Sequence, residues 1–330
     1  MVDGIKIIGT GSYLPPKVMT NDEFVAMGLD TSDEWIVQRT GIRERRIAAP
    51  DVVTSDLALE ASRRALAMAG RNPADVDLIV MATVTPDTHC PAAANWLQAK
   101  LGASRAVTFD ITAACSGFIF ATDVARQYLL AGNARTVLVV AGEVMSRTLN
   151  WQNRATCIIF GDGAGAMVLE SGKDGHQLLN SRIHSDGGRG QNLLVPGGGS
   201  QVTPITPESA ARGDHFLDMI EANKSFRVAV RHFIAAIREG AGAVGVAVEE
   251  IDWFVPHQAN MRMFKNMSHS MGIPMEKFVI TIHKYGNISS ASCAIALDEA
   301  IRQKQIRPGH LICMPVFGGG LTWGYAMLRW

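Results

Sequence analysis

The sequence predicts an α/β fold, and two patterns in the chain support this class. Short apolar, β-branched runs alternate with helical patterns along the 330 residues, which is typical of a mostly parallel sheet covered by helices. The order of elements in the first half also returns in the second. At 47% hydrophobic residues the chain is long enough for one large core or for two core units of about 150 residues each. We therefore expect two related halves, residues 1–172 and 173–330, forming one compact unit.

In the first half, Ser55 and Gly70 bracket an Ala- and Leu-rich helix as N-cap and C′ residue. Pro91 suits the first turn of a second helix, which ends near Gly102. The remaining expected elements are a helix over residues 116–131 and strands over 76–82, 106–111, 136–141 and 165–170.

The second half repeats this plan. A helix ending near Gly240 precedes a strand over 251–255, as the helix ending at Gly70 precedes the strand over 76–82. Matching positions lie 175 residues apart at Asp77 and Asp252 (252 − 77) and 157 apart at Phe160 and Phe317 (317 − 160). Offsets that agree only loosely favour an ancient duplication over a short-period solenoid.

Composition excludes several classes of function. Lys plus Arg equals Asp plus Glu at 31 each, so no overall field favours nucleic acid or an anionic membrane. Five cysteines without CxxC spacing argue against a disulfide framework or a zinc cluster. The N-terminus does not resemble a signal peptide, and no apolar run reaches the ~18 residues that span a bilayer. We expect a cytoplasmic protein.

Cys115 is the main candidate for chemistry. It lies where the apolar run over 106–111 gives way to a helical pattern, and a thiol over the unpaired N–H groups of a helix start is placed where the dipole favours an anion. Such a site lowers a thiol pKa from ~8.5 into the range ~3.5 to 7.5. The alternative is a buried core residue, which is the commoner role of a lone cysteine.

Two further polar groups follow corresponding strands. His257 comes directly after the strand over 251–255, and Asn287 follows an expected strand over 278–282, opposite Cys115 in the repeat. The carboxyl ends of parallel strands are where α/β sites form. A lone histidine after a strand is more often structural, but three polar groups on corresponding strand ends favour a shared site.

The chain resembles the β-ketoacyl-acyl-carrier-protein synthase III family of the thiolase superfamily. Six motifs in order carry the resemblance: Thr31–Val37 with Arg39–Arg43, Ala114–Phe118, Phe160–Gly165, His257–Asn260, Gly286–Ser289 and Phe317–Gly324. The resemblance implies a thiolase-like fold, in which two duplicated βαβαβαββ halves form a five-layer αβαβα arrangement, and a homodimer.

The resemblance also implies a reaction. Cys115 would take an acyl group from acyl-CoA, with the N–H groups of Cys115 and Gly319 as the oxyanion hole. Malonyl-acyl carrier protein would then lose CO2, and His257 and Asn287 would stabilise the enolate that attacks the acyl group. The product is a β-ketoacyl-acyl carrier protein, which initiates fatty acid synthesis, and no metal or redox cofactor is required.

By resemblance, Trp35 and Arg154 would sandwich the CoA adenine, with Arg39 near the phosphates and Asn260 along the pantetheine arm. Arg43, Arg45 and Arg46 are otherwise typical of a solvated basic loop. An acidic carrier protein would dock on Arg262 and Lys265, three residues apart on one helix. No role is assigned to residues 219–226, where the chain is one residue longer than the family pattern.

The acyl pocket is assigned to Cys90, Phe160 and Phe317. Relatives that prefer short primers carry phenylalanine in place of Cys90, contributed across the dimer. A smaller side chain predicts primers longer than acetyl, unless a neighbouring side chain fills the space.

Rival interpretations start from the same residues. Elongating synthases carry histidine in place of Asn287, and thiolases need a second cysteine in the last glycine-rich loop. Cys313 precedes that loop and, like Cys157 and Cys293, is expected in the core. The Cys–His–Asn order also occurs in papain-like proteases, but not in this local sequence. Two further candidates are a synthase of specialised metabolism with a non-carrier acceptor and a non-catalytic acyl-CoA binder.

Overall fold

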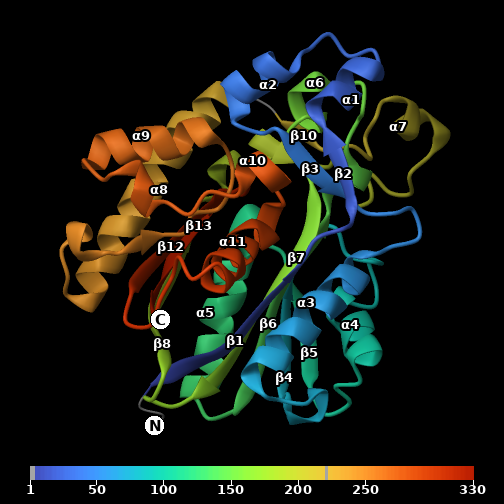
Figure 1. Ribbon diagram of the computed structural model, residues 1–330. Coiled ribbons are helices and arrows are strands. Elements are labelled where there is room, and N and C mark those ends of the chain that lie inside the picture. Colours follow the sequence, from blue (N-terminus) through green and yellow to red (C-terminus); the bar gives the residue numbers. More distant parts are fainter. Residues whose placement is uncertain (1–3, 220–221) are drawn as a thin grey trace.

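The structure is a computed structural model that describes residues 4–219 and 222–330, without the side chains of residues 222–225. In these residues one nine-stranded sheet has the order β11-β12-β13-β8-β1-β7-β6-β4-β5 (Figure 1). Its strands are β1 (Ile5–Tyr13), β4 (Leu78–Ala82), β5 (Val107–Ile111), β6 (Thr136–Val144), β7 (Asp162–Ser171), β8 (His176–Ser185), β11 (Trp253–Phe254), β12 (Leu311–Gly318) and β13 (Thr322–Arg329).

The strand order contains the predicted repeat. In the first half β4 runs parallel to β5 and β6, and β7 runs antiparallel to β6 and β1. In the second half β11 runs parallel to β12, and β13 runs antiparallel to β12 and β8. The halves meet where β1 pairs with β8 at Ile7 and His176. The predicted division after residue 172 falls in the turn between β7 and β8 and stays a prediction.

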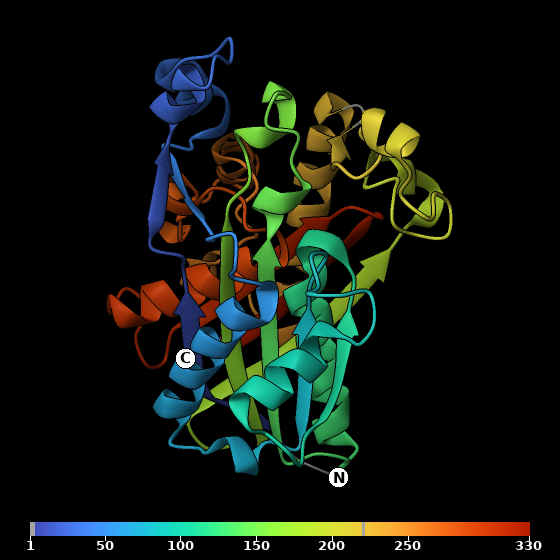
Figure 2. The same cartoon turned by 90° about the vertical axis from the view of Figure 1, so that its right-hand side faces the viewer.

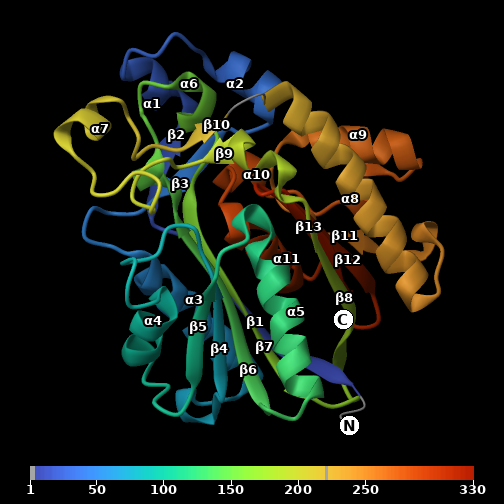
Figure 3. The same cartoon turned by 180° about the vertical axis from the view of Figure 1, so that it is seen from behind.

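Helices lie in three layers, one on the outer face of each half of the sheet and one between the two halves. With the two halves of the sheet, they form the expected five-layer αβαβα arrangement (Figures 1 and 3). The outer face of the first half is covered by α3 (Thr54–Ala69) and α4 (Ala93–Leu101), and that of the second half by α8 (Ala222–Val244) and α9 (Met261–Met271). Between the halves lie α5 (Gly117–Leu130) and α11 (Ser292–Arg302).

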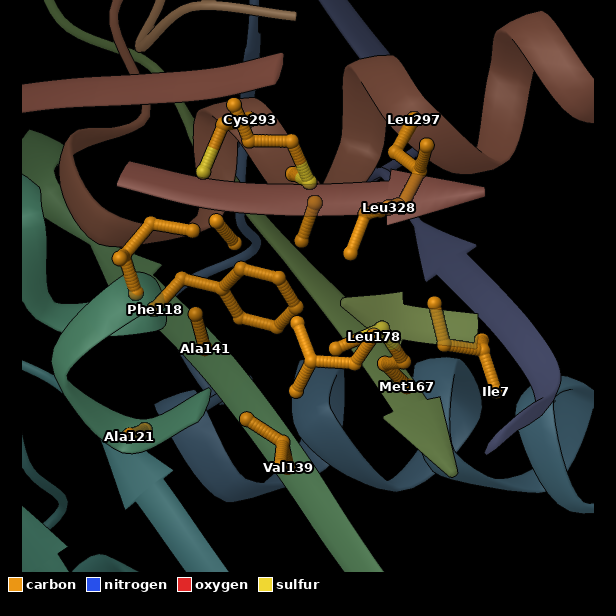
Figure 4. Packing of buried hydrophobic residues seen from close by; sticks show 14 of the residues in the cluster. Ile7, Phe118, Ala121, Val139, Ala141, Met167, Leu178, Cys293, Leu297 and Leu328 are labelled. Atoms are coloured by element: carbon orange, nitrogen blue, oxygen red, sulfur yellow. The ribbon is translucent and has the colours of Figure 1, made fainter. Parts of the chain in front are cut away.

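The central layer carries the largest core. Phe118 of α5 and Leu297 of α11 pack with Met167, Leu178 and Leu328 from the strands on either side (Figure 4). Each large apolar side chain buried in this way contributes about 1.5–3 kcal/mol. The predicted core cysteines are also buried: Cys157, Cys293 and Cys313.

Further short elements lie above the carboxyl ends of the parallel strands β4, β5 and β6 (Figures 1 and 2). They are β2 (Lys17–Thr20), α1 (Asn21–Ala26), α2 (Asp33–Thr40), β3 (Glu44–Ile47), α6 (Arg154–Cys157), β9 (Leu193–Leu194), α7 (Pro207–Ala211), β10 (Asp218–Met219) and α10 (Ile282–Tyr285). Among the described residues, none of the helices combines the length and apolar character needed to cross a membrane.

Gly240 does not end its helix, contrary to the sequence prediction. α8 continues to Val244, and Gly245, with φ of 73°, follows its last residue. Gly245 lies 175 residues after Gly70 (245 − 70), which ends α3 with φ of 62°. Gly240 instead allows close packing, because a Cβ there would come within 2.9 Å of Tyr325 on β13.

Two helix starts also differ from the prediction. α3 begins at Thr54 with Val53 as N-cap residue, and Ser55 lies inside the helix. α4 begins at Ala93 rather than in the turn of Pro91. The Asp110 carboxylate of β5 accepts hydrogen bonds from the backbone of Ala93 and Ala94 at 2.6 and 2.8 Å, so a residue distant in sequence caps this helix.

The strand predicted over 278–282 is reduced to one bridge between Phe254 and Phe278. The chain turns into the short helix α10 at Ile282 instead of continuing along the sheet edge. This turn brings Asn287 back toward the end of the first-half strands, where Phe160 and Asn287 form a second bridge.

Candidate active site

Cys115 lies in a 3-10 turn, Ala114–Ser116, between β5 and α5. Ala114 adopts a left-handed φ of 46°. The N–H of Ser116 donates to the carbonyl of Ala113 at 3.1 Å, so the Cys115 N–H precedes the first bond of the turn and belongs to the unpaired amides of a helix start. The Cys115 side chain is 7% exposed.

Burial raises the pKa of the Cys115 thiol to about 12. The Glu143 carboxylate also raises this pKa, and the Ser289 side chain in the same cavity wall acts against both effects. The prediction of a lowered thiol pKa is therefore wrong for the free protein. Desolvation raises the pKa by more than the unpaired N–H groups at the start of the helix lower it. The resting side chain is a thiol.

His257 follows β11 and is held by the neighbouring strand β12, because its N–H donates to the carbonyl of Pro315 at 3.1 Å. The ring is buried, and burial lowers its pKa to about 3. Nδ1 lies 2.7 Å from the Ser292 hydroxyl. His257 is therefore a neutral imidazole at neutral pH.

The tautomer of His257 follows from its two partners. The Ser292 oxygen already accepts the Gln258 N–H at 3.1 Å, and the described residues offer its proton no acceptor besides Nδ1. The backbone of Ser289, the second group acting on the ring, raises the pKa of His257 against the effect of burial. We therefore assign the ring proton to Nε2.

Asn287 is fixed through its backbone and one side-chain atom. Its N–H donates to the carbonyl of Ile159 at 2.9 Å, and its carbonyl accepts the N–H of Gly161 at 3.1 Å. The side-chain Oδ1 accepts the N–H of Ser289 at 2.8 Å. The amide group Nδ2 is left to face the cavity as a donor.

The loop that follows β12 closes against the Cys115 turn. Thr322 Oγ1 donates to the carbonyl of Ala113 at 2.9 Å, and a Cβ on Gly318 would lie 2.7 Å from the Cys115 nitrogen. Only glycine permits this approach. It brings Gly319 to the cavity wall beside Cys115.

Two cavities meet at Cys115. The first, of about 240 Å³, contains His257 and Asn287 in its wall and extends toward Arg262 on α9. The second, of about 390 Å³, has an apolar wall that includes Met145, Leu194, Val195 and Leu217. Both cavities share four lining residues: Cys115, Phe160, Leu193 and Gly319. The structure thus brings the predicted catalytic residues to one place.

The residues assigned to CoA by resemblance also lie together. The guanidinium carbons of Arg39 and Arg154 are 4.4 and 4.5 Å from the centre of the Trp35 ring. Asn260 is the N-cap of α9, where Oδ1 accepts the Arg262 N–H at 2.8 Å and Nδ2 donates to the Arg39 carbonyl at 3.1 Å. Asn260 therefore joins α2 to α9 at the cavity.

Other predicted residues lie as follows. Phe160 lines both cavities and Phe317 only the first. Cys90 is exposed and outside the wall of either cavity in the single chain. Arg262 and Lys265 are exposed on α9. Met219 and Phe226 line the first cavity, and residues 220–221 and the side chains of 222–225 between them lie outside the described residues.

The sequence analysis missed the positions of Ser290 and Arg45 in the structure. The counterpart of Cys115 in the repeat is Ser290 (290 − 115 = 175) rather than Asn287, because Ser289–Ala291 is the second 3-10 turn. Arg45, expected on a solvated loop, is fully buried and donates to Asn21 and to the carbonyls of Met19 and Ile158.

Within the described residues no group of three His, Cys, Asp or Glu side chains could hold a metal ion.

Comparisons with known proteins agree with this geometry. Residues 109–187 match the family model 3-oxoacyl-[acyl-carrier-protein] synthase III, and residues 242–330 match the model of its C-terminal part. The β-ketoacyl-[acyl-carrier-protein] synthase III of Caldanaerobacter subterraneus subsp. tengcongensis is 45% identical over 98% of this chain and 97% of its own length.

Solved structures give the same result. The 3-oxoacyl-[acyl-carrier-protein] synthase III of Aquifex aeolicus is 41% identical and superposes with a TM-score of 0.90, covering 99% of this chain and all of that one. The priming β-ketosynthase of the R1128 polyketide pathway is 34% identical at the same TM-score, covering 99% and 97%. This chain belongs to the β-ketoacyl-[acyl-carrier-protein] synthase III family of condensing acyltransferases.

Proposed function

We propose that the protein transfers an acyl group from acyl-CoA to Cys115 and condenses it with malonyl-acyl carrier protein. The single observation that carries this proposal is the cavity wall in which Cys115, His257 and Asn287 meet beside Gly319. The product would be a β-ketoacyl-acyl carrier protein, with CO2 and CoA released. The chemistry requires no metal or redox cofactor.

In the first half-reaction, Cys115 attacks the thioester carbonyl. The carbonyl oxygen becomes an oxyanion, which the N–H groups of Cys115 and Gly319 stabilise. One such preorganised donor contributes about 2.7–4 kcal/mol to the transition state. The close contact between Gly318 and the Cys115 turn supports this role, because it holds the glycine-rich loop with Gly319 beside Cys115 in the cavity wall.

In the second half-reaction, malonyl-acyl carrier protein loses CO2 and forms an enolate. His257 Nε2–H and Asn287 Nδ2 act as donors to the enolate oxygen, a role supported by the tautomer of His257 and by the engaged Oδ1 of Asn287. The enolate carbon then attacks the acyl group on Cys115 and forms the carbon–carbon bond.

The CoA and carrier-protein parts of the two substrates bind at the mouth of the first cavity. The CoA adenine stacks between Trp35 and Arg154, Arg39 meets the phosphates, and Asn260 lies along the pantetheine arm. In the free protein Arg154 covers the Trp35 ring directly, so the adenine enters by displacing a guanidinium. The acidic carrier protein docks on Arg262 and Lys265, which are exposed beside this mouth.

Two copies of the chain pair through β5. This strand ends the sheet, and Val107 on it is 62% exposed; an open apolar edge favours addition of another strand. Sedimentation should give twice the mass of one chain, and a monomer at micromolar concentration would contradict the pairing. Cys90 would then reach the acyl pocket of the partner copy.

Primer length tests the pocket assignment. A small side chain at Cys90 leaves room for primers longer than acetyl, each buried methylene contributing up to ~0.8 kcal/mol. Initial rates with octanoyl-CoA relative to acetyl-CoA should fall in Cys90→Phe. A strict acetyl preference that the substitution leaves unchanged would contradict this assignment.

The decisive experiment for the function is intact-protein mass spectrometry after incubation with a panel of acyl-CoAs. The wild type should gain the mass of one acyl group, and Cys115→Ala should gain none. An adduct that persists in Cys115→Ala, or condensation that continues without Cys115, would rule out the nucleophile. The mass gained also identifies the preferred chain length.

A second candidate keeps the nucleophile and changes the acceptor. The structural relative named a priming β-ketosynthase of a polyketide pathway supports this alternative. Purified acyl-enzyme should give product with malonyl-acyl carrier protein. Product only with a free small-molecule acceptor would favour the alternative.

A further inference from the structure

Arg45 carries a buried positive charge for which the proposed half-reactions have no task. Its side chain on β3 is fully buried, and burial lowers its pKa to about 10, so the guanidinium is still a cation at neutral pH. It donates to three neutral oxygens: the carbonyls of Met19 and Ile158 at 3.1 and 2.8 Å, and Oδ1 of Asn21 at 2.9 Å. Burying a cation on neutral acceptors costs free energy, so the places of these oxygens in the fold are informative.

The three oxygens belong to separate elements around the Trp35 ring. Met19 lies on β2 and Asn21 is the first residue of α1. Ile158 is the C-cap of α6, the four-residue helix that begins at Arg154. Carbonyls at the end of a helix lack a partner within it, and the guanidinium supplies one. One side chain thus fastens the helix that carries Arg154 to β2 and α1.

Asn21 extends this connection to α2. Its Nδ2 donates to Oδ1 of Asp33 and to the carbonyl of Ile42, each at 2.8 Å. Asp33 is the first residue of α2, and Trp35 lies in the same helical turn. Arg45 is therefore one hydrogen bond away from α6 and two away from α2, the helices that carry the two sides of the proposed adenine site.

We propose that Arg45 is a positioning residue for CoA, which holds α2 and α6 at the spacing that lets adenine enter between Trp35 and Arg154. This role rests on the proposed binding of CoA. In the free protein the Arg154 guanidinium lies 4.5 Å from the centre of the Trp35 ring, and adenine displaces that side chain while the two helices keep their places. A site held in its bound spacing loses less conformational freedom when the ligand enters.

The planar fork of this guanidinium suits the task. Nη2 donates to both Asn21 and Ile158, and Nη1 donates to Met19, so the directions of all three bonds are set by one rigid group. The same group lies 4.7 Å from the centre of the Phe24 ring on α1. Phe24 in turn stacks on Trp151, just before α6, with ring centres 6.1 Å apart. A lysine has donors that rotate about one point and cannot fix these directions.

The contacts of the Arg45 Cβ separate this role from catalysis. A Cβ on Gly161 or Gly286 would lie 3.1 or 3.4 Å from it, and these two glycines flank the backbone of Asn287. A substitution that keeps Cβ and the length of the side chain should therefore leave Asn287 in place. Methionine meets both conditions and cannot donate a hydrogen bond.

Arg45→Met is the first test. Acylation of Cys115 by acetyl-CoA should show a KM raised by about 5–100-fold, the range for losing one stack of a base on an aromatic ring. Acylation by S-acetyl-pantetheine, which lacks the nucleotide, should stay within about two-fold of wild type, as should kcat with acetyl-CoA. Trp35→Ala gives the reference loss. In that background Arg45→Met should raise KM by less than about two-fold further.

Two matched variants follow the connection in either direction. Arg45→Lys keeps the charge without the fork, so its KM for acetyl-CoA should lie between those of wild type and Arg45→Met. Asn21→Asp keeps the acceptor for Arg45 but has no donor for Asp33 or Ile42, so it should raise the KM for acetyl-CoA and spare S-acetyl-pantetheine. A wild-type KM in Asn21→Asp would contradict the link to α2. If Arg45→Met does not fold, these two variants carry the same comparison of substrates.

The outcomes separate this proposal from the proposed function. A wild type that forms no acyl adduct would refute the function, and calorimetric titration with CoA would still test the positioning role, because binding should weaken in Arg45→Met by the same factor as KM. An acylated wild type and an Arg45→Met variant with equal KM for acetyl-CoA would refute only the positioning role. Equal losses with acetyl-CoA and S-acetyl-pantetheine would also overturn it, since a substrate without adenine does not use the site.

Discussion

The two junctions at the starts of the central helices α5 and α11 have the same backbone conformation and different side chains. In each, a 3-10 turn leads directly into a central helix, α5 or α11. The first residue of each turn is left-handed, with φ of 46° at Ala114 and 42° at Ser289. The two positions lie 175 residues apart (289 − 114), the same separation as the helix ends at Gly70 and Gly245.

The side chains at the matching positions have diverged. The first junction presents Cys115 to both cavities. The second has serines instead, of which Ser290 bonds Glu143 and Ser292 bonds His257. Both halves have the turn that exposes amides at the start of a helix, and this turn carries a cysteine in the first half and serines in the second. The comparison predicts that the two junctions control different half-reactions.

The largest expected effect tests this division directly. Asn287→Ala removes a donor to the enolate, so malonyl decarboxylation should fall about 10²–10³-fold while an acyl adduct still forms on Cys115. Asn287→Asp keeps the shape and the acceptor for Ser289 but has no N–H, so it should fail similarly. Carbon dioxide release and intact mass measure the two steps. Loss of the acyl adduct in Asn287→Asp would show that the two junctions do not control different half-reactions.

The ionisation of Cys115 tests the first junction. Burial holds the thiol pKa at about 12, so in a Cys90→Ser background the rate of alkylation by iodoacetamide should rise about tenfold per pH unit from pH 7 to 10. Intact mass at each pH follows the reaction, and Cys115→Ala is the unlabelled control. A plateau below pH 8 would mean that the helix start, rather than burial, sets the pKa.

The second junction should make stability depend on pH through His257. Its pKa falls from 6.5 in the unfolded chain to about 3 in the folded protein, so between these values only the unfolded chain binds the proton. Stability should therefore decrease as pH falls, by about 1.4 kcal/mol per unit. From pH 6.5 to 4.5 this amounts to about 2–3 kcal/mol.

Urea unfolding of the wild type and of His257→Gln measures this contribution. The glutamine variant should lack it, while the remaining titratable groups act equally in both proteins. Identical pH dependence in the two proteins would show that the buried ring is not held neutral by the fold.

Features encoded locally were predictable from the sequence. Gly70 and Gly102 end their helices with left-handed φ, as glycine after a helical pattern predicts, and the fully buried β4 and β6 are continuous apolar runs. Cys115 and His257 follow β5 and β11, as the sequence predicts, whereas the strand predicted before Asn287 is only one bridge, so the family motif rather than the repeat located that residue. The family motifs located the residues around Trp35 in the same way.

Features that depend on distant contacts were not predictable. Cys115 is desolvated at a place where the loop at Gly318 of the other half packs against its turn, which no local pattern records. Ser290 and Glu143 are 147 residues apart in sequence and meet only across the two junctions. The offset of 175 residues could have identified Ser290 as the counterpart of Cys115, because the short helix α10 occupies the positions that β5 occupies in the first half (282 − 107 = 175).

Gly240 and Gly242 lie in the same helix and differ in their contacts with distant residues. Alanine substitutions at these two positions have the smallest expected effect on stability. Helix propensity alone predicts that alanine at either position stabilises α8 by about 0.5–1 kcal/mol. A Cβ at Gly242 meets no neighbour, so Gly242→Ala should follow this rule. A Cβ at Gly240 would lie 2.9 Å from Tyr325 and 3.0 Å from the sulfur of Met327 on β13, so Gly240→Ala should destabilise the protein by about 1–3 kcal/mol. Free energies of unfolding in urea measure both effects. If both substitutions stabilise the protein, the close packing of α8 on β13 does not depend on the absence of a side chain at Gly240.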